Sequence, residues 1–326
     1  MTSLVKSEAI KLISTRTFYG LMAVAAGVML LGSTLMSADA RNLERPLQDR
    51  SSEECLPANP RLAFVRDLGG SVGNEIITVR PDGSGLKRLT DNHNDEWGPA
   101  WSPDGTRIAF SSTRDGNSEI YVMDRAGREV TRLTENGASD GVPAWSPDGT
   151  KIAFSSARDD PEGIMFDLYV MDADGTNVTK IIGAPGSEQN PSWSANGRRI
   201  AFDRDDRIFT VRVDGTDLKK LTSRRRMLAT NPSWSHDGGH ILFQAQTSEE
   251  NGMDIFVMRR DGTNKRPLIA KGGEQQSPSW SPNDRRIALS SSWRVARARS
   301  DGSGVVSLFH HDLADYAVDW GRAVRC

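Results

Sequence analysis

The sequence predicts an all-β fold, a six-bladed β-propeller closed by pairing of its N- and C-terminal strands. Three observations predict it: a tryptophan phrase that recurs along the chain, short strand patterns between the repeats, and an incomplete unit at each end. Five of six tryptophans, spaced by roughly 40 to 48 residues, stand in a variant of x-W-S-x-[DN]-x; the six are Trp101, Trp145, Trp193, Trp234, Trp280 and Trp320. A period of this size that holds four short strands is typical of propeller blades.

Each unit is expected to hold four strands, as the unit led by Trp101 illustrates. Its strands are predicted at residues 99–102, 107–112, 119–124 and 130–134. Pro103-Asp104-Gly105 is typical of a type I turn between the first two strands. A second turn, between the third and fourth strands, is marked by Asp-Gly in five units: Asp82-Gly83, Asp174-Gly175, Asp214-Gly215, Asp261-Gly262 and Asp301-Gly302.

The second and third strands of each unit are apolar at successive positions, as in IAFSS at residues 108–112 and IYVM at residues 120–123. A strand with one solvated face would alternate, so these runs indicate strands buried on both faces, between neighbouring blades. From residue 60 onward the sequence shows no sustained helical period. The pattern therefore favours a single all-β domain.

The two ends of the repeat region predict how the ring closes. Residues 61–66 and 75–90 supply the last three strands of a blade without a tryptophan-led first strand, and residues 317–320 supply a first strand without companions. Joining them completes a sixth blade. The pairing also removes two open sheet edges, which would otherwise favour aggregation.

Length and charge exclude one class of partner. The 326-residue chain is long enough for one large β domain with a substantial core. Its 41 basic and 43 acidic residues are mixed along the sequence and give a formal net charge of -2. Because nucleic-acid binding needs a strong basic field, we predict no nucleic-acid partner.

Residues 1–40 are predicted to be a signal peptide or a signal anchor. Lys6, Lys11 and Arg16 precede an uncharged stretch at residues 17–37, which ends at Ala38-Asp39-Ala40, a sequence typical of a signal cleavage site. The stretch is also about as long as the ~20 residues that span a bilayer, which keeps the anchor alternative open. Residues 41–60 are polar and are expected to form a disordered tether. The propeller is therefore predicted in the periplasm or outside the cell, either free or anchored through residues 17–37.

Two cysteines in an exported protein invite a disulfide. Cys55 precedes the first predicted strand by six residues, and Cys326 follows Trp320 by six. If the terminal strands pair, these flanks emerge near one another, and a Cys55–Cys326 bridge would fasten the ring at its closure. The alternative is two free thiols at the chain ends.

The repeat P-x-W-S-P-D-G-x-x-I-A-F-x-S, followed by x-I-Y-V-M-D-x-x-G and x-x-L-T, resembles the TolB-type propeller repeat, a relative of the WD-repeat class. The resemblance covers residues 61–326. It implies a six-bladed propeller in the periplasm and binding to other envelope proteins. TolB has an additional α/β domain ahead of its propeller, and the stretch between the predicted signal and the first strand is too short for it. The resemblance therefore extends to the propeller domain only.

The predicted binding face carries the variable connections between blades and between the second and third strands, because variable loops on a rigid scaffold usually carry function. Five residues before each tryptophan stand Glu96, Asp140, Glu188, Ala229, Gln275 and Asp315. Four of these six are carboxylates. If the first strands line the channel, they form a partial anionic ring that suits a basic peptide segment or a divalent cation. The alternative is a set of ordinary solvated loop carboxylates.

Two aromatic residues near the ring closure are further candidates for partner contact. Trp97 and Tyr316 each stand four residues before a repeat tryptophan and could present aromatic area to a ligand. Packing at the rim is the alternative. The six repeat tryptophans themselves are expected to pack between blades. The run Arg224-Arg225-Arg226 is expected to be a solvated patch or a partner contact.

The sequence favours a non-catalytic, monomeric binding scaffold whose partner is an envelope or extracellular protein or peptide. It predicts no cofactor and no metal site. The competing hypothesis is a carbohydrate-active lyase or hydrolase that uses the channel, with His93, His310 or His311 acting beside carboxylates, with or without a metal. The sequence holds no ligand motif that selects this second class.

Overall fold

The computed structural model describes residues 60–321, apart from residues 71, 184, 224, 226, 248–251, 271 and 310–312. The predictions on residues 1–40, on most of the tether, and on Cys55, Cys326, His310 and His311 lie outside this part. The described residues belong to one compact unit, and the following concerns that unit alone. Among its described residues no helix has the length and apolar character needed to cross a membrane.

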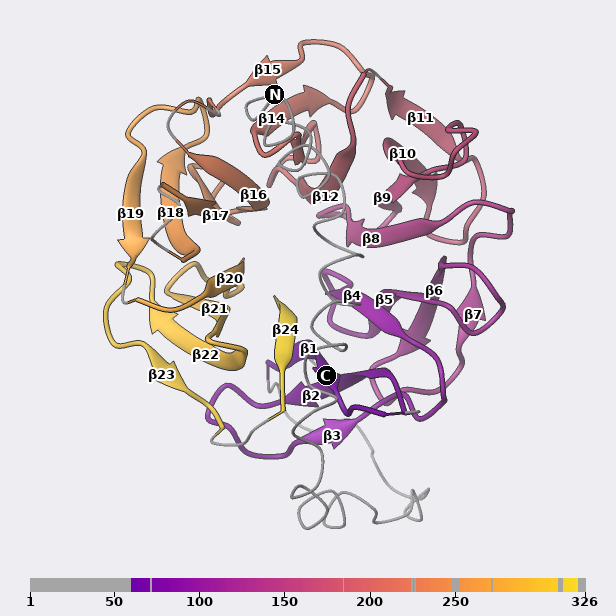
Figure 1. The fold of residues 1–326 in the computed structure, drawn as a ribbon, viewed down its shortest axis with the longest axis horizontal. Coiled ribbons are helices and arrows are strands. Elements are labelled where there is room, and N and C mark those ends of the chain that lie inside the picture. The colour runs from indigo at the N-terminus through magenta and orange to yellow at the C-terminus, as the bar shows by residue number, and fades with distance from the viewer. Residues whose placement is uncertain are drawn as a thin grey trace, which may run out of the picture. The chain divides into compact units, whose positions relative to one another are not determined.

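The described chain forms six four-stranded antiparallel sheets arranged as the blades of a ring (Figure 1). This confirms the predicted all-β, six-bladed propeller. From the inner to the outer strand, blade 1 consists of β24 (Asp315–Trp320), β1 (Leu62–Asp67), β2 (Asn74–Val79) and β3 (Lys87–Arg88). Blade 2 consists of β4 (Glu96–Trp101), β5 (Arg107–Ser112), β6 (Glu119–Asp124) and β7 (Thr131–Arg132), and blade 3 of β8 (Asp140–Trp145), β9 (Lys151–Ser156), β10 (Asp167–Asp172) and β11 (Thr179–Ile182).

The remaining blades follow the same order. Blade 4 consists of β12 (Glu188–Trp193), β13 (Arg199–Arg204), β14 (Ile208–Arg212) and β15 (Lys219–Lys220). Blade 5 consists of β16 (Leu228–Trp234), β17 (His240–Gln246), β18 (Asp254–Arg259) and β19 (Arg266–Ile269). Blade 6 consists of β20 (Gln275–Trp280), β21 (Arg286–Ser291), β22 (Arg294–Arg299) and β23 (Val306–Ser307).

The ring closes through the strand from the end of the chain, as predicted. β24 pairs antiparallel with β1, in a register that places Leu62 opposite Trp320 and Arg66 opposite Asp315. Beyond the pair, the Gly321 N–H donates to the Arg61 carbonyl over 2.8 Å. Blade 1 is therefore built from both ends of the described chain, which leaves no unpaired inner edge.

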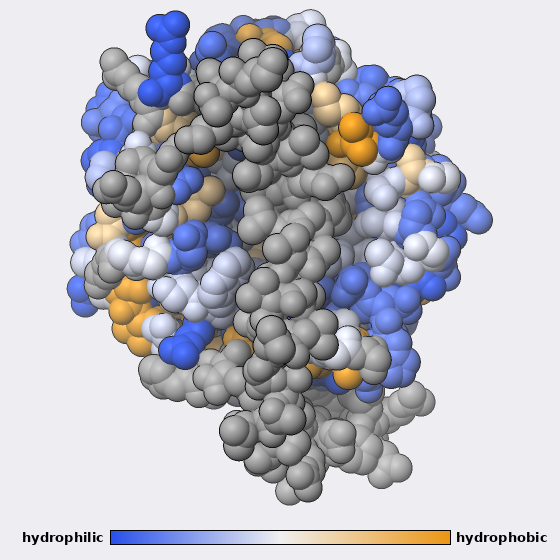
Figure 2. All heavy atoms as spheres, viewed as in Figure 1, coloured by the Kyte–Doolittle hydropathy of each residue, from blue (hydrophilic) through white to orange (hydrophobic). Residues whose placement is uncertain are grey.

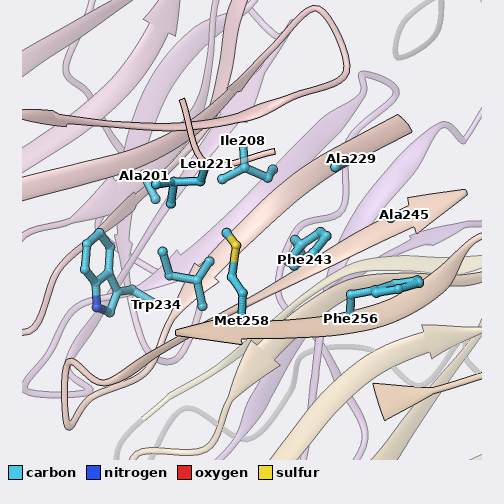
Figure 3. Close-up of a cluster of buried hydrophobic side chains, with 10 residues drawn as sticks. Ala201, Ile208, Leu221, Ala229, Trp234, Phe243, Ala245, Phe256 and Met258 are labelled. Atoms are coloured by element: carbon cyan, nitrogen blue, oxygen red, sulfur yellow. The ribbon is translucent and has the colours of Figure 1, made fainter. Parts of the chain in front are cut away.

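The core lies between the blades. Six clusters of buried apolar side chains each draw on two adjacent sheets, and each contains one repeat tryptophan. In one of them Trp234 packs in a cluster with Met258 of its own blade and Ala201 of the preceding blade (Figure 3). The packing role predicted for the six tryptophans is thus confirmed, and it explains why their spacing reports the number of blades.

Turn residues also serve blade packing. The glycine between the third and outer strands has φ near +85° and lies against the preceding blade: a Cβ on Gly127, Gly175 or Gly215 would come within 2.6 Å of a carbonyl oxygen at or next to that blade's outer strand. Only glycine accepts both this backbone angle and this approach. Gly175 and Gly215 belong to Asp-Gly turns, so this signal marks an interblade contact as well as a turn.

Every inner strand carries a bulge that the sequence patterns did not predict. The third residue before each repeat tryptophan has φ near +50°, in the order Gly98, Val142, Asn190, Asn231, Ser277 and Ala317. Side chains of the preceding blade cap some of these bulges: Ser111 Oγ accepts the Val142 N–H, and Asp203 Oδ1 accepts the Asn231 N–H over 2.9 Å. Such left-handed residues cost energy, and the interblade hydrogen bonds offset it.

Antiparallel pairing gives the ring two distinct faces. One, the turn face, carries the connections from inner to second strands and from third to outer strands; the other, the loop face, carries the remaining connections. Each inner-to-second connection on the turn face holds five residues. On the loop face the connection between second and third strands ranges from residues 157–166 in blade 3 to residues 292–293 in blade 6. Variation is therefore concentrated on the loop face.

Candidate partner-binding face

The predicted ring of carboxylates lies at the loop-face end of the inner strands, but it is not open to solvent. Glu96, Asp140, Glu188 and Asp315 each begin an inner strand and are 0 % exposed. Gln275 is 2 % exposed and Ala229 is fully buried. The expectation of solvent-exposed carboxylates was wrong, because these side chains are fully buried. Whether they contribute to partner binding stays a prediction.

Each of the four carboxylates is neutralised by an arginine of its own blade. The nitrogen-to-oxygen distances are 3.1 Å for Arg114 and Glu96, 2.7 Å for Arg158 and Asp140, and 2.7 Å for Arg66 and Asp315. Glu188 forms the same pair with Arg204. Buried charges of opposite sign in contact stabilise one another, and they contribute little field to the surface above them.

The arginines also cover aromatic side chains. The Arg158 guanidinium lies 4.8 Å from the ring centre of Tyr169 and 5.4 Å from that of Phe154, and these two rings stack on each other. Arg114 covers Phe110 and Tyr121 in the same way. Cation–π contacts of this kind add to the ion pair and hold the arginine in one orientation.

Blade 5 shows the alternative arrangement. Its stacked pair, Phe243 and Phe256, is retained, but Ala229 stands in place of the acid and pairs with Ala245. Figure 3 shows these two alanines on neighbouring strands, at the same end of the cluster as the two phenylalanines and away from Trp234. The acid and the arginine are absent together. The signal that sequence reasoning missed is therefore the shared occurrence of acid and arginine within a repeat.

A second layer of polar side chains ties blade 1 to blade 2 and blade 2 to blade 3. The Asn92 backbone N–H donates to Glu75 of blade 1, and its Nδ2 donates to Glu96 of blade 2 over 3.0 Å. Arg88 donates to the same Glu75 oxygen over 2.8 Å. One blade further on the arrangement recurs with Glu119, Arg132, Asn136 and Asp140. The network fixes the start of the inner strands and hence the loops that lead into them.

Burial dominates the electrostatics of this layer. It raises the pKa of Glu75 to about 7, against the hydrogen bonds from Thr90, Asn92 and Arg88, which favour the carboxylate. Burial likewise raises the pKa of Asp140, although Ser156 and Arg158 oppose the shift. Charged groups held in this way are costly unless their partners stay in place. The loop face is therefore supported by a layer that resists rearrangement.

Some acceptors of this layer have no hydrogen-bond partner among the described residues. They are Glu96 Oε2, Asp140 Oδ1, Glu188 Oε2 and Gln275 Oε1, which belong to four of the six positions of the predicted ring. Nor do the described residues contain a group of three or more His, Cys, Asp or Glu side chains arranged to hold a metal ion. His93, on the loop face, is exposed.

The two aromatic candidates lie together. The Trp97 and Tyr316 rings stack with centroids 5.7 Å apart. Tyr316 is 6 % exposed and its hydroxyl donates to Asn74 Oδ1, so it packs rather than presents a surface. Trp97 is half-buried and keeps part of its ring accessible. The structure thus brings together the pair from blades 1 and 2 and leaves only Trp97 able to contribute contact area.

Apolar exposure on the described surface is scattered. Figure 2 shows a face whose described residues are mostly hydrophilic, with separate hydrophobic patches. The exposed large apolar side chains are Val130, Ile164, Val178, Leu218, Trp293 and Val306. Ile164 and Trp293 stand on loop-face connections, whereas the other four lie at or next to outer strands. Sequence reasoning did not single out Ile164 or Trp293.

Comparison with known proteins agrees with this architecture. A model of the TolB beta propeller domain matches residues 82–284. Tol-Pal system protein TolB of Xanthomonas campestris is 31% identical over 119 residues, which are 34% of this chain and 27% of that protein. Dipeptidyl-peptidase 5 of Porphyromonas gingivalis is 48% identical over 46 residues, 14% of this chain and 7% of that protein. The chain thus matches less than a third of the length of these relatives.

Solved structures show the same fold at low identity. TolB from Acinetobacter baumannii superposes with a TM-score of 0.69 at 20% identity, over 80% of this chain and 66% of that one. A chain of the nidogen/laminin complex reaches a TM-score of 0.67 at 13% identity, over 82% of this chain and 100% of that one. Similarity at this level concerns the arrangement of the blades alone.

Proposed function

Because the chain belongs to the TolB beta-propeller domain family, we propose that it is an exported, non-catalytic binding scaffold that docks a segment of an envelope or extracellular protein on its loop face. The observation that carries the proposal is the contrast between the two faces. The inner-to-second connections of the turn face are uniform in length, whereas the loop face varies from blade to blade. A rigid frame with one variable face is the usual design of a recognition surface.

The buried layer beneath the loop face supports rigid presentation. Ion pairs such as Arg158–Asp140 and bridges such as Asn92 hold the loop ends before any partner arrives. A pre-organised surface loses little conformational entropy on binding, so more of the contact energy appears as affinity. In this proposal the buried residues Glu96, Asp140, Glu188, Gln275 and Asp315 act by fixing the loops, and the contact itself is made by exposed residues above them.

The test compares two variants that differ only in which face they alter. The loop-face variant combines Ile164→Glu with Glu135→Lys; Ile164 is 59 % exposed and the Glu135 side chain 85 %. The turn-face control combines Leu218→Glu with Glu129→Lys, likewise an exposed aliphatic residue and an exposed glutamate changed to lysine. Affinity capture from the native compartment, quantified by mass spectrometry, should lose its specific partners with the first variant and keep them with the second. Equal capture by both would refute the proposal.

Export and a disulfide beside the ring closure are proposed with it. Residues 1–40 would direct the chain across a membrane, as a cleaved signal or as an anchor through residues 17–37, and Cys55 would bridge to Cys326. N-terminal sequencing of the mature protein distinguishes signal from anchor. Non-reducing peptide mapping that finds both thiols free would remove the bridge.

A further inference from the structure

One loop-face residue has a backbone conformation that its side chain does not favour. Ser292 and Trp293 form the two-residue connection between β21 and β22, with φ of 48° and 64°. Two positive angles in such a hairpin are normally met by Asn-Gly or Asp-Gly. In blade 4 the comparable hairpin uses Asp205 and Asp206, which tolerate this region. A bulky aromatic residue there is an outlier, and Trp293 is in addition 45 % exposed.

Hydrogen bonds place Trp293 beside the ring closure. The Trp293 carbonyl accepts the Asp315 N–H over 2.8 Å. The carbonyl of Ala314, the residue before Asp315, accepts the Asp67 N–H over 2.9 Å. The next residue, Tyr316, stacks on Trp97. Residues 314–316 therefore join blades 6, 1 and 2 at the loop face. Around this short segment stand Trp293, Asp67, Trp97 and Asp95, which together we call the seam site.

The seam site combines aromatic area with negative charge. Asp67 is exposed, and Asp95 is partly exposed while it accepts two hydrogen bonds from Asn74 over 3.1 and 2.8 Å. The deeper Asp315 contributes little, because Arg66 neutralises it over 2.7 Å. The seam site thus offers an exposed and a partly exposed indole ring together with an exposed and a partly exposed carboxylate. Such a surface attracts a cation electrostatically and also offers it a π face.

We propose that the seam site determines specificity by taking a lysine or arginine side chain of the docked partner segment, with Trp293 as its exposed anchor. This rests on the proposed function. Tryptophan is prominent among residues that carry interface energy, and backbone strain persists at sites where the surrounding structure and the function require it. Neither packing nor turn chemistry accounts for a half-exposed tryptophan where Gly or Asn is preferred.

The test is a titration followed by the indole N–H resonance of Trp293, in the ¹⁵N-labelled full propeller chain. Two peptides of nine residues serve as probes: a Gly/Ser sequence with two arginines, and the same sequence with two glutamates. The arginine peptide should shift the resonance in a saturable and salt-sensitive manner, and the glutamate peptide should not. Asp67→Asn should weaken binding of the arginine peptide roughly threefold to tenfold. Trp293→Gly should weaken it about tenfold, as measured from the Trp97 resonance.

Stability separates this role from a structural one. Because glycine suits the left-handed region, Trp293→Gly should leave the melting temperature unchanged or raise it by about 2 °C. Asp206→Gly makes the same backbone change in blade 4 and should leave peptide binding intact. Three outcomes would overturn the proposal. They are an equal response to both peptides, undiminished binding of the arginine peptide by Trp293→Gly, and a fall of several degrees in the melting temperature of that variant. If that occurs while the loop-face variant still loses its partners, the seam site fails and the proposed function stands.

Discussion

The pairing of Arg158 with Asp140 gives the most quantitative prediction. Arg158→Ala leaves Asp140 fully buried, with Oδ1 already lacking a partner and Oδ2 deprived of its 2.7 Å contact. Removing one partner of a buried ion pair costs roughly 3 to 5 kcal/mol. The Asn136 amide remains 2.8 Å from the carboxylate, and the acid can bind a proton. We therefore expect the low end, about 3 kcal/mol, which lowers the melting temperature by roughly 6 to 12 °C.

Removing both charges tests the reasoning more sharply. Blade 5 already folds with Ala229 and Ala245 at its loop-face end. The double variant Arg158→Ala/Asp140→Ala should therefore cost less than the sum of its single variants, by at least about 1 kcal/mol. Urea unfolding followed by circular dichroism at constant m-value measures all three free energies of unfolding. The assignment of a buried pair would be refuted if the free energy of unfolding of Arg158→Ala lay within about 0.5 kcal/mol of the parent's. It would also be refuted if the losses of the two single variants added up to that of the double variant.

Three further changes probe other parts of the frame. Burial raises the pKa of Asp203 to about 7, so the folded state holds this proton more tightly and the carboxyl's contribution to stability falls as pH rises from about 4 to 7. Asp203→Asn should therefore gain roughly 4 kcal/mol over the parent at pH 8 and little at pH 4. Gly127→Ala should cost about 2 kcal/mol or more, because its Cβ would lie 2.6 Å from the Leu89 carbonyl. Asp319→Ala should cost about 1 to 3 kcal/mol, because the Trp101 N–H loses its 2.8 Å acceptor.

Each of these changes has its own control. A pH profile of unfolding that is the same for Asp203→Asn and the parent would show that this carboxyl does not titrate between the two states. Gly116 also has a positive φ, of 113°, but a Cβ there would meet nothing within 4 Å. Gly116→Ala thus reports the backbone cost alone, and a loss equal to that of Gly127→Ala would contradict the interblade contact. For Asp319, rescue by Asp319→Asn should restore most of the stability, since an amide oxygen can still accept.

The sequence was sufficient for the fold because blade packing repeats. One tryptophan in each interblade cluster, and in five of the six blades an Asp-Gly turn against the neighbouring blade, impose a period that can be counted directly. The closure of β24 on β1 followed from two incomplete units. In contrast, the bulge at Val142 and Ala317 could not be predicted, because neither residue has the Gly or Asn character that marks a left-handed position.

The candidate site was predicted in position but not in environment. Aligning the repeats placed Glu96 and its equivalents at the loop-face end of the inner strands, where the structure has them. Their burial depends on arginines such as Arg114, which come from the second strand or the loop after it and lie on stacked aromatic rings. An alignment of the inner strands alone does not reveal the arginine that pairs with each acid. Trp293 escaped notice because only its backbone angle, and not its residue type, distinguishes it.

The most direct test of the central claim is photo-cross-linking in the native compartment, with a photoreactive amino acid placed at one exposed position at a time. Loop-face positions would be His93 and Ile164, and turn-face positions Leu218 and Val178. Docking on the loop face predicts one shared cross-linked protein from His93 and Ile164 and none in common from Leu218 and Val178. The same product from the turn face, or from all four positions equally, would contradict it.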